Sequence, residues 1–305
     1  MGKIAFVFAG QGAQYSGMGK SLYEASDSAK KLYDAAEEIR PGTKNQSFSG
    51  ADEELKQTVN TQPCLFLVDL AAALALNDNG IYADGTAGFS LGEIAALAYS
   101  GAYSHDDGFK IVTERGKFMQ SAGVSDTAMA AVLKLDKDTV VNLTKKFEKL
   151  YAVNYKCPGQ TVVSGLKQSI ESFEEEVNAA GGKVIPLSVS GAFHSPFMQK
   201  AAEQFGDFLE NCSVNKPKIP VYANLTAKPY ENEVKDTMAK QIENPVRWQE
   251  TVENMIKDGF TDFIEVGAGK TLSGLIKKTS KEVKIYSVQD AESLRKTIEE
   301  LKNNA

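Results

Sequence analysis

Apolar, strand-forming runs alternate with helix-forming segments along most of the chain. Residues 3–8 read Lys-Ile-Ala-Phe-Val-Phe, and a continuous apolar run of this kind is typical of a strand covered on both faces of a parallel sheet. Similar runs predict further strands at 219–224, 261–266 and 284–288. Segments with helical composition lie at 61–77, 106–120, 196–209, 234–242, 246–258, 272–279 and the C-terminus. Strands that alternate with helices predict an α/β fold.

The middle of the chain follows a different order of elements. A strand, a helix, two strands, a helix and a strand are predicted at 128–135, 136–149, 151–154, 160–164, 168–180 and 183–188. This is the ferredoxin-like order, and it is complete in itself. Linkers rich in small residues flank it near 121–125 and 188–191. We therefore predict a large α/β catalytic domain of residues 1–124 and 191–305, with a small ferredoxin-like domain, residues 125–190, inserted into it.

The composition is that of an ordinary globular protein, with 42% hydrophobic and 24% charged residues in 305 positions. The net charge of −6 argues against non-specific binding to nucleic acid, which needs a basic surface. The longest apolar stretch, 64–76, contains Asp69 and is predicted to be a buried helix, so we expect no membrane span. The three cysteines form no Cys-x-x-Cys pair, which predicts a reduced, cytoplasmic protein without a thiolate metal site.

The stretch from Gly88 to Gly92 reads Gly-x-Ser-x-Gly. A short strand is predicted before it, at 83–87, and a helix after it, at 93–98. In that context the pattern predicts a sharp turn that presents the hydroxyl of Ser90 at the N-terminus of a helix, where backbone N–H groups favour developing negative charge. We therefore predict that Ser90 is a nucleophile.

A serine hydroxyl needs a base, and the chain has two histidines. His105 lies among polar residues at a predicted helix start and is expected to be solvated. His194 lies in a loop of small residues just after the predicted insertion, and loops of this kind collect catalytic residues in α/β folds. We therefore predict His194 as the base.

Acyl transfer also needs donors for the oxyanion. The backbone N–H of Leu91 follows the nucleophile and is one natural donor. The loop Gly10-Gln11-Gly12, directly after the first strand, can supply a second because its glycines permit close approach. Two other patterns fail as nucleotide-binding motifs. Gly269-Lys270-Thr271 ends like a phosphate-binding loop, but that loop needs glycine five positions before Gly269, where this chain has Ile264. Gly10-x-Gly12 begins like the dinucleotide motif, but that motif needs glycine at position 15, where this chain has Tyr15.

Taken together, these motifs resemble the malonyl-CoA:acyl-carrier-protein transacylase family. The resemblance rests on ordered blocks that cover nearly the whole chain: 10–14, 88–93, 114–119, His194, 244–248 and 265–270. It implies an α/β-hydrolase-like large domain with an inserted ferredoxin-like subdomain, which agrees with the predicted order of elements. It also implies malonyl transfer from malonyl-CoA to acyl carrier protein through a malonyl-serine, with no cofactor and no metal.

The resemblance further implies residue roles. The main-chain carbonyl of Gln241 would orient His194, and backbone N–H groups of Gln11 and Leu91 would bind the oxyanion. Arg115 would hold the malonyl carboxylate, a role that suits a guanidinium because it donates two parallel hydrogen bonds. The family commonly has histidine before the nucleophile, and this chain has Phe89 instead.

That departure bears on acyl selectivity. Phe89 removes a hydrogen bond and adds bulk beside the acyl group. Phe193 belongs to an Ala-Phe-His sequence that resembles malonyl-selective polyketide acyltransferases, in which the ring crowds out a methyl branch. A stand-alone acyltransferase of polyketide synthesis is therefore an alternative to fatty-acid biosynthesis.

Two other classes stay open. A serine thioesterase or esterase would share the nucleophile and base, although it has no use for Arg115. A docking subunit without activity is the non-enzyme alternative. We expect a monomer, and four lysines are candidates for contacting an acidic carrier protein: Lys110, Lys117, Lys200 and Lys270.

Overall fold

The computed structural model describes residues 2–187 and 191–303, and its strands form two separate sheets. The first sheet is parallel, in the order β7-β2-β1-β8-β9. Its strands are β1 (Lys3–Phe8), β2 (Gly85–Gly88), β7 (Val221–Tyr222), β8 (Phe260–Val266) and β9 (Lys284–Val288). The second is antiparallel, in the order β4-β5-β3-β6, with β3 (Thr127–Leu133), β4 (Leu150–Cys157), β5 (Gln160–Leu166) and β6 (Lys183–Leu187). The predicted mixed α/β class is therefore confirmed.

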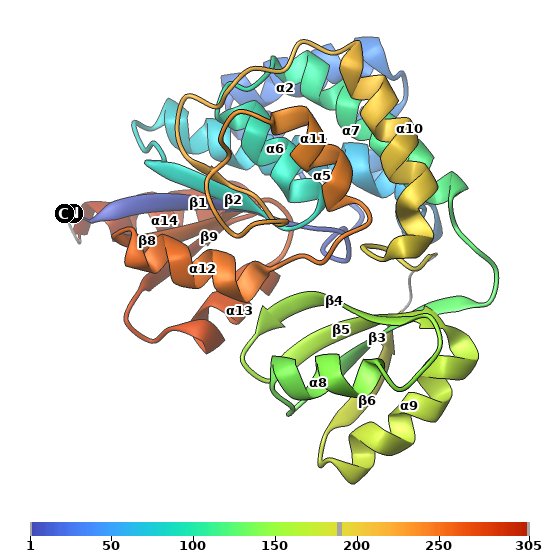
Figure 1. The fold of residues 1–305 in the computed structure, drawn as a ribbon. Helices are drawn as coiled ribbons and strands as arrows, with labels where there is room; N and C mark the ends of the chain where they lie inside the picture. The colour runs from blue at the N-terminus through green and yellow to red at the C-terminus, as the bar shows by residue number, and fades with distance from the viewer. Residues whose placement is uncertain (1, 188–190, 304–305) are drawn as a thin grey trace.

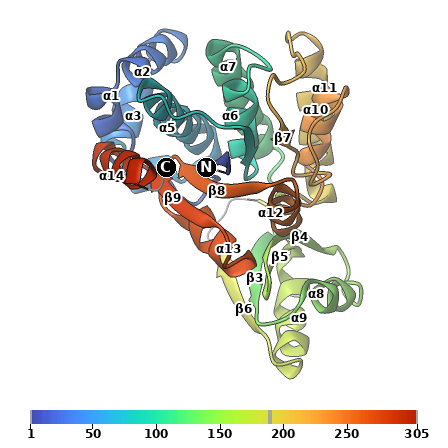
Figure 2. The ribbon, with the colours of Figure 1, turned by 90° about the vertical axis from the view of Figure 1, so that its left-hand side faces the viewer.

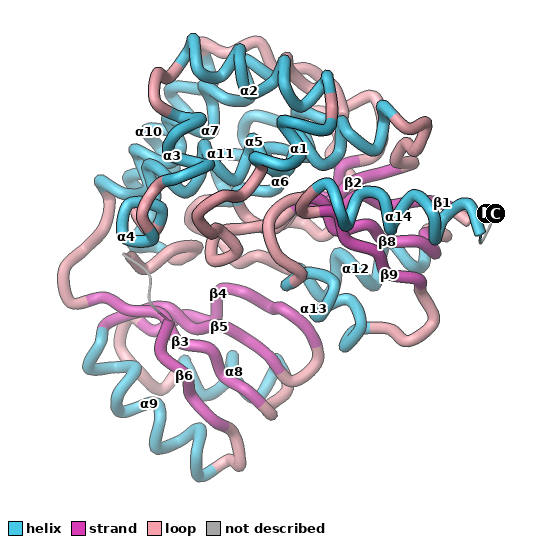
Figure 3. Tube along the Cα trace, turned by 180° about the vertical axis from the view of Figure 1, so that it is seen from behind, coloured by secondary structure: helices cyan, strands magenta, loops and turns pink. Residues whose placement is uncertain are grey.

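Helices cover both sides of the parallel sheet (Figure 1). One side carries α5 (Thr58–Asp78), α6 (Leu91–Tyr99), α7 (His105–Ser121), α10 (Gln199–Glu210) and α11 (Val234–Gln241). The other side carries α12 (Trp248–Lys257) and α13 (Thr271–Thr279), which lie between the two sheets (Figures 1 and 3). The C-terminal α14 (Ala291–Asn303) lies beside β9 (Figure 2). On the antiparallel sheet, α8 (Lys137–Thr144) and α9 (Lys167–Ala179) pack on the face away from the parallel sheet.

Alternate residues of β1 enter two different cores. Phe6 and Phe8 pack into the core beneath α5 and α6, whereas Ala5 and Val7 pack into a second core with Trp248 of α12. All five side chains are fully buried. This two-sided burial is the reason that the first strand is apolar at consecutive positions.

Some predicted boundaries differ from the structure. Helix α5 begins at Thr58, not near residue 61, so Pro63 lies inside the helix, where it lacks an N–H to donate. Strand β7 has only two residues, because the chain leaves the sheet toward the site described below. Four helices were not predicted because they are polar and mostly short: α1 (Lys20–Ala25), α2 (Asp27–Ile39), α3 (Thr43–Ser49) and α4 (Asp52–Leu55). Residues 188–190 of the linker predicted at 188–191, with the domain boundary at residue 190, lie outside the described residues.

Within the described part of the chain, α5 is the one helix that is long and apolar enough to cross a membrane. Of its apolar 18-residue stretch, 89% is buried inside the protein. Asp69, in the middle of this helix, is fully buried. Neither carboxylate oxygen has a hydrogen-bond partner among the described residues, and Oδ1 packs directly against Gly267, where a Cβ would lie 1.7 Å away. Burial, with Glu265 nearby, raises the pKa of Asp69 well above its ordinary value of 3.8.

We expect Asp69→Asn to stabilise the protein at neutral pH. The folded protein keeps the Asp69 proton to higher pH than the unfolded chain, so the stability that this proton supplies is complete below about pH 4 and is lost as pH rises toward the raised pKa. The variant should therefore match the parent near pH 4 and exceed it by about 1–3 kcal/mol at pH 7–8. Urea unfolding at both pH values measures this, with exposed Asp207→Asn as the control; an equal effect at both pH values would contradict the account.

Candidate active site

The nucleophile candidate sits on a strained turn between β2 and α6. Ser90 has φ 56° and ψ −105°, a backbone conformation that few non-glycine residues adopt. Both neighbouring glycines are required by close packing: a Cβ on Gly88 would lie 2.0 Å from the backbone of Gly92, and one on Gly92 would lie 2.3 Å from the carbonyl oxygen of Phe8. The Gly-x-Ser-x-Gly pattern therefore has a steric cause in this fold.

The structure brings Ser90 and His194 together across 104 positions of sequence. The Nε2 atom of His194 lies 2.8 Å from Ser90 Oγ, and Nδ1 lies 2.9 Å from the main-chain oxygen of Gln241. A carbonyl oxygen only accepts, so Nδ1 carries the proton and Nε2 is free to accept the hydroxyl proton of Ser90. Burial and the nearby charge of Arg115 lower the pKa of His194 to about 4, so the ring is neutral at pH 7.

Arg115 of α7 is fully buried and contacts the same serine. Its Nη2 donates to Ser90 Oγ at 3.2 Å and to Gln241 Oε1 at 2.7 Å, and its Nη1 donates to Gln62 Oε1 at 2.8 Å. Burial lowers the pKa of Arg115 to about 10, which still leaves it charged at neutral pH. Its Nε has no acceptor among the described residues, so one buried donor of this cation is unused beside the serine.

Gln241, the last residue of α11, makes more contacts than its predicted role requires. Its main-chain oxygen accepts from His194, as the resemblance implies. Its side chain also donates from Nε2 to the main-chain oxygen of Ser90 at 2.9 Å and accepts from Arg115. Gln241 therefore joins His194, Arg115 and the Ser90 turn.

Two further residues of this site were missed by sequence reasoning. Asn224 follows β7, and its side chain accepts from Ser90 N–H at 2.7 Å and donates to the Gly88 carbonyl at 2.6 Å. Asn224 is held in turn by Glu93 of α6, whose carboxylate accepts the Asn224 N–H and the Tyr230 hydroxyl. An asparagine after a short strand gives no local signal, but a glutamate within the apolar run 91–98 is a signal that could have been read.

Glu93 is fully buried, and burial raises its pKa to about 7. The hydrogen bonds from Tyr230 and Asn224, together with the charge of Arg115, oppose that rise. The buried guanidinium therefore has a carboxyl group close enough to interact with it, and this group supports the turn and not the histidine.

We expect Asn224→Ala to lower kcat without a matching change in KM. Asn224 bonds the Ser90 N–H and the Gly88 carbonyl of the strained turn, and a shift of the Ser90 hydroxyl by about 1 Å can cost about 100-fold in rate. Steady-state kinetics should show kcat lower by about 10- to 100-fold and KM for the acyl donor within about threefold.

The matched control is Asn254→Ala. The Asn254 side chain donates to the main-chain oxygen of Ala227 and not to an atom of the Ser90 turn, so its loss should change stability but not kcat. An Asn224→Ala enzyme with unchanged kcat would show that this residue does not position Ser90.

The predicted oxyanion donors lie on the two segments that border the turn. Leu91 begins α6, so its N–H is one of those that have no acceptor within the helix. Gln11 follows β1 in a loop that packs on the turn, since a Cβ on Gly10 would lie 2.7 Å from the Phe89 carbonyl oxygen. The Gln11 side chain donates from Nε2 to Thr58 Oγ1 at 3.3 Å.

A cleft of about 300 Å³ opens beside the turn, between the two sheets. The parallel-sheet side supplies Gln11 and Phe89, and the antiparallel sheet supplies Lys156 and Leu187. The remaining lining is Ala9, Gly10, Gly12, Ala13, Glu265, Thr271, Leu272 and Leu275. We refer to this space as the cleft.

Phe89 lies half-buried at the edge of the cleft. Its ring stacks edge-on against Trp248 with centroids 5.7 Å apart, and Lys156 Nζ lies 5.7 Å from the ring centroid. Phe193, the other predicted acyl-contacting ring, is 7% exposed and belongs to the main core, outside the cleft lining. Of the two rings, Phe89 is therefore the one placed to face an acyl chain in this cleft.

The second histidine lies elsewhere. His105 begins α7 and lines a groove with Lys31 and Leu74, away from Ser90. It is half-buried, so the expectation that it is solvated was only partly correct, and burial lowers its pKa.

The segment 267–271, which fails as a phosphate-binding loop, leads into α13. The N-terminal N–H groups of this helix are occupied by a protein carboxylate, because Glu265 accepts from Leu272 at 2.9 Å and from Ser273 at 2.7 Å. Among residues 2–187 and 191–303, no group of three or more His, Cys, Asp or Glu side chains is arranged to hold a metal ion.

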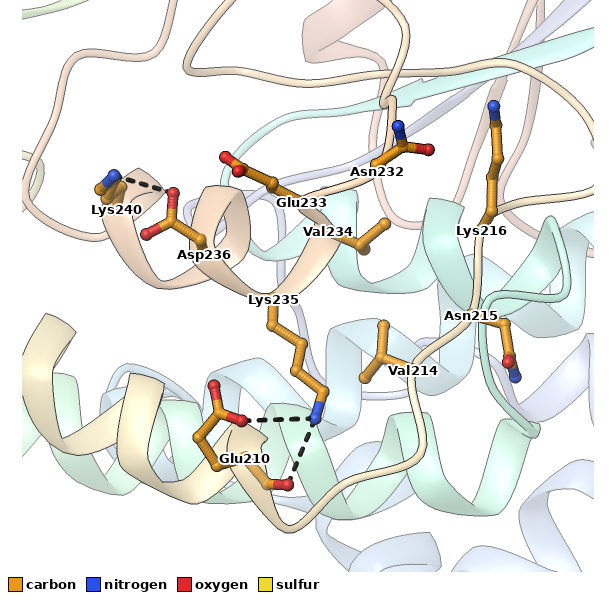
Figure 4. Close-up of a pocket in the computed structure, with 10 residues that line it drawn as sticks. All are labelled: Glu210, Val214, Asn215, Lys216, Asn232, Glu233, Val234, Lys235, Asp236 and Lys240. Atoms are coloured by element: carbon orange, nitrogen blue, oxygen red, sulfur yellow. Dashed lines mark hydrogen bonds and ion pairs between the residues drawn. The ribbon is translucent and has the colours of Figure 1, made fainter.

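A larger groove of about 620 Å³ lies at the N-terminal end of α11, whereas Gln241 lies at its C-terminal end. Figure 4 shows that two of its lysines point to acids: Lys235 to Glu210, and Lys240 to Asp236. Three lysines and three acids line it, so its charges balance. We refer to it as the α11 groove.

A sharp turn at the end of a parallel strand, with a neutral histidine and a buried arginine on the same serine hydroxyl, fits an acyl-transferring enzyme. Comparison with known proteins agrees: the family model described as "Acyl transferase domain" matches residues 5–305, and the chain belongs to this family.

Individual relatives carry a more specific description than the family model does. A curated malonyl CoA-acyl carrier protein transacylase of Bacillus subtilis is 40% identical, over 99% of this chain and 98% of that protein. A transacylase structure of the same description from Clostridium perfringens has a TM-score of 0.96 at 36% identity, over 99% of this chain and 98% of that one. A malonyl-transacylase in complex with a type II PKS acyl-carrier protein has a TM-score of 0.94 at 31% identity, over 98% and 99%. The family resemblance stated from the sequence is thereby confirmed.

Proposed function

We propose that this enzyme transfers a malonyl group from malonyl-CoA to the phosphopantetheine thiol of acyl carrier protein through a malonyl-serine at Ser90. The observation that carries the proposal is the shared contact of Ser90 Oγ with His194 Nε2, at 2.8 Å, and with the buried Arg115 Nη2, at 3.2 Å. The base accounts for acyl transfer. The guanidinium accounts for an acyl group that ends in a carboxylate.

The proposed chemistry has two balanced steps. Ser90 Oγ attacks the thioester carbon while its proton passes to His194 Nε2, and the C–S bond then breaks as CoA leaves with that proton. The thiol sulfur of the carrier prosthetic group next attacks the ester carbon of the malonyl-serine while its proton passes to His194 Nε2. The C–O bond to Ser90 then breaks, and Ser90 Oγ regains that proton. Backbone N–H groups of Gln11 and Leu91 would bind the oxyanion in both steps.

The malonyl carboxylate would accept hydrogen bonds from Arg115. The Arg115 Nε is a buried donor without an acceptor among residues 2–187 and 191–303, and a carboxylate bound side-on to Nε and an Nη atom would satisfy it. Gln241 would hold His194 through its main-chain oxygen and steady Arg115 through its side chain. Phe89 would limit the size of the acyl group from the cleft lining, whereas the same role for Phe193, which lies outside that lining, stays a sequence-based prediction.

A discharge assay separates this transferase from a serine thioesterase or esterase. The purified enzyme is loaded with radiolabelled malonyl-CoA, freed of excess donor and divided between buffer and holo acyl carrier protein. We expect the label to leave slowly in buffer and to move rapidly to the carrier. Equal release in both samples would identify a hydrolase.

Fatty-acid biosynthesis is the pathway that we propose. The likeness to a transacylase bound to a type II PKS carrier favours polyketide synthesis as the specific alternative. Steady-state transfer to carriers of both kinds, by the same enzyme preparation, distinguishes the two.

The finer description of the fold is part of the same proposal. The parallel sheet with its nucleophilic turn supports an α/β-hydrolase-like large domain of residues 1–124 and 191–305. The β3-α8-β4-β5-α9-β6 order supports a ferredoxin-like insertion of residues 125–190. We further propose a cytoplasmic monomer that uses no cofactor. The free thiols of Cys64, Cys157 and Cys212 suit a reducing compartment.

A further inference from the structure

A second groove of about 620 Å³ lies between α13, β9 and α14. Its charged lining residues are Lys270, Lys277, Lys281, Lys296 and Glu300. We refer to it as the α13 groove. It carries four cations and one acid, whereas the α11 groove of the same volume is balanced and the whole chain has a net charge of −6. The positive charge is therefore local to this groove and opposite in sign to the net charge of the protein.

Most of these cations are available to a partner. Lys270, Lys277 and Lys281 are exposed, and none of them forms an ion pair with another part of the chain that the structure describes. Lys296 lies 3.8 Å from Glu300. Unpaired surface cations around one hollow attract an acidic surface through their summed field.

Pairing with an acid also distinguishes among the four lysines that the sequence suggested as carrier contacts. Lys110 and Lys117 pair with acids one turn away on α7, Asp107 and Glu114. Of the four lysines proposed from the sequence for contacting a carrier, Lys270 is the one that lines a groove with excess positive charge.

Helix α13 connects this groove to the cleft. Thr271, Leu272 and Leu275 line the cleft, while Gly274 and Lys277 of the same helix line the groove. Figure 2 shows α13 beside the antiparallel sheet at one end and beside β9 at the other. A partner seated in the groove would therefore be one helix diameter from the cleft beside Ser90.

We propose that the α13 groove docks the acyl carrier protein through an acidic face of that protein, with the prosthetic arm passing α13 into the cleft. This inference rests on the proposed transfer to a carrier. Charge complementarity of this kind acts mainly on encounter with the partner and leaves chemistry at the serine unaffected.

The test is Lys277→Glu combined with Lys281→Glu in the full-length enzyme. Malonyl transfer from malonyl-CoA is measured to holo acyl carrier protein and, separately, to free pantetheine, a small uncharged thiol. We expect KM for the carrier to rise by about tenfold or more. Transfer to pantetheine and KM for malonyl-CoA should stay within about twofold, since neither uses the groove.

The matched control is Lys110→Glu with Lys117→Glu, which makes the same change in net charge on α7. An unchanged carrier KM in the test variant, or an equal rise in the control, would overturn the docking proposal. A rise in KM for malonyl-CoA alone would assign the groove to the phosphates of CoA and also overturn it.

Two measurements on the unaltered enzyme distinguish a failure of the docking proposal from misfolding of the double variant and from a failure of the proposed function. Added NaCl should raise KM for the carrier far more than KM for pantetheine, and equal sensitivity would count against docking even if the double variant fails to fold. Transfer to pantetheine without transfer to any carrier would instead refute the proposed function itself.

Discussion

Replacing Ser90 with alanine should lower malonyl transfer by about 10⁴-fold or more, because the alcohol that carries the acyl group is lost. His194→Ala should cause a loss of similar size, since Ser90 Oγ then has no base within hydrogen-bond distance. The double variant should be no worse than either single variant, because the two side chains act as one unit. Transfer assays over a wide range of enzyme concentration measure all three losses.

Ser100→Ala is the matched control. Ser100 is buried, follows the last residue of the same helix and bonds Thr86, so its loss perturbs α6 without touching the reacting atoms. It should retain near-parental transfer. Additive losses in the double variant would show that Ser90 and His194 act independently.

Replacing Arg115 with alanine should lower malonyl transfer far more than acetyl transfer. The carboxylate would lose its buried cation, a change of about 2–5 kcal/mol, or roughly 30-fold to several thousandfold in relative kcat/KM. Acetyl-CoA presents no carboxylate, so its transfer should fall only as far as the loss of contacts to Ser90 and Gln241 requires. The ratio of the two kcat/KM values isolates the effect.

Arg115→Lys tests the geometry of the same contact. Lysine keeps the charge but lacks the planar fork, so malonyl selectivity should recover only in part. Arg40→Ala removes another hydrogen-bonded arginine, one that contacts Thr43, Gln46 and Asn60, and should leave the ratio unchanged. An equal loss for both acyl groups in Arg115→Ala would remove Arg115 from carboxylate binding.

The elements of this fold were largely readable from the sequence because their signals are local. The apolar run at residues 3–8 is β1, and the two-sided burial of its residues explains the pattern. The central β-α-β-β-α-β order was also readable, as β3 to β6 with α8 and α9. The short polar helices α1, α3 and α4 were not, since segments of four to seven residues carry little periodic signal. Helix α2 does carry a stripe of buried residues at helical spacing, Ala29, Leu32, Tyr33 and Ala36, and that signal was missed.

The pairing of Ser90 with His194 was predictable for a different reason. The chain contains only two histidines, and one of them lies in a loop suited to a site. The side-chain contacts of Gln241, Asn224 and Glu93 were not predictable, because they join residues more than 100 positions apart through atoms that no motif specifies. Packing around a strained turn, not local sequence, decides which polar groups meet there.

Intact-protein mass spectrometry after brief mixing with malonyl-CoA tests the central claim most directly. The account predicts that the mass increases by one malonyl group, that peptide mapping places it on Ser90, and that addition of holo acyl carrier protein removes it. A fully active enzyme whose Ser90 stays unmodified, or a malonyl group found on another residue, would contradict the account.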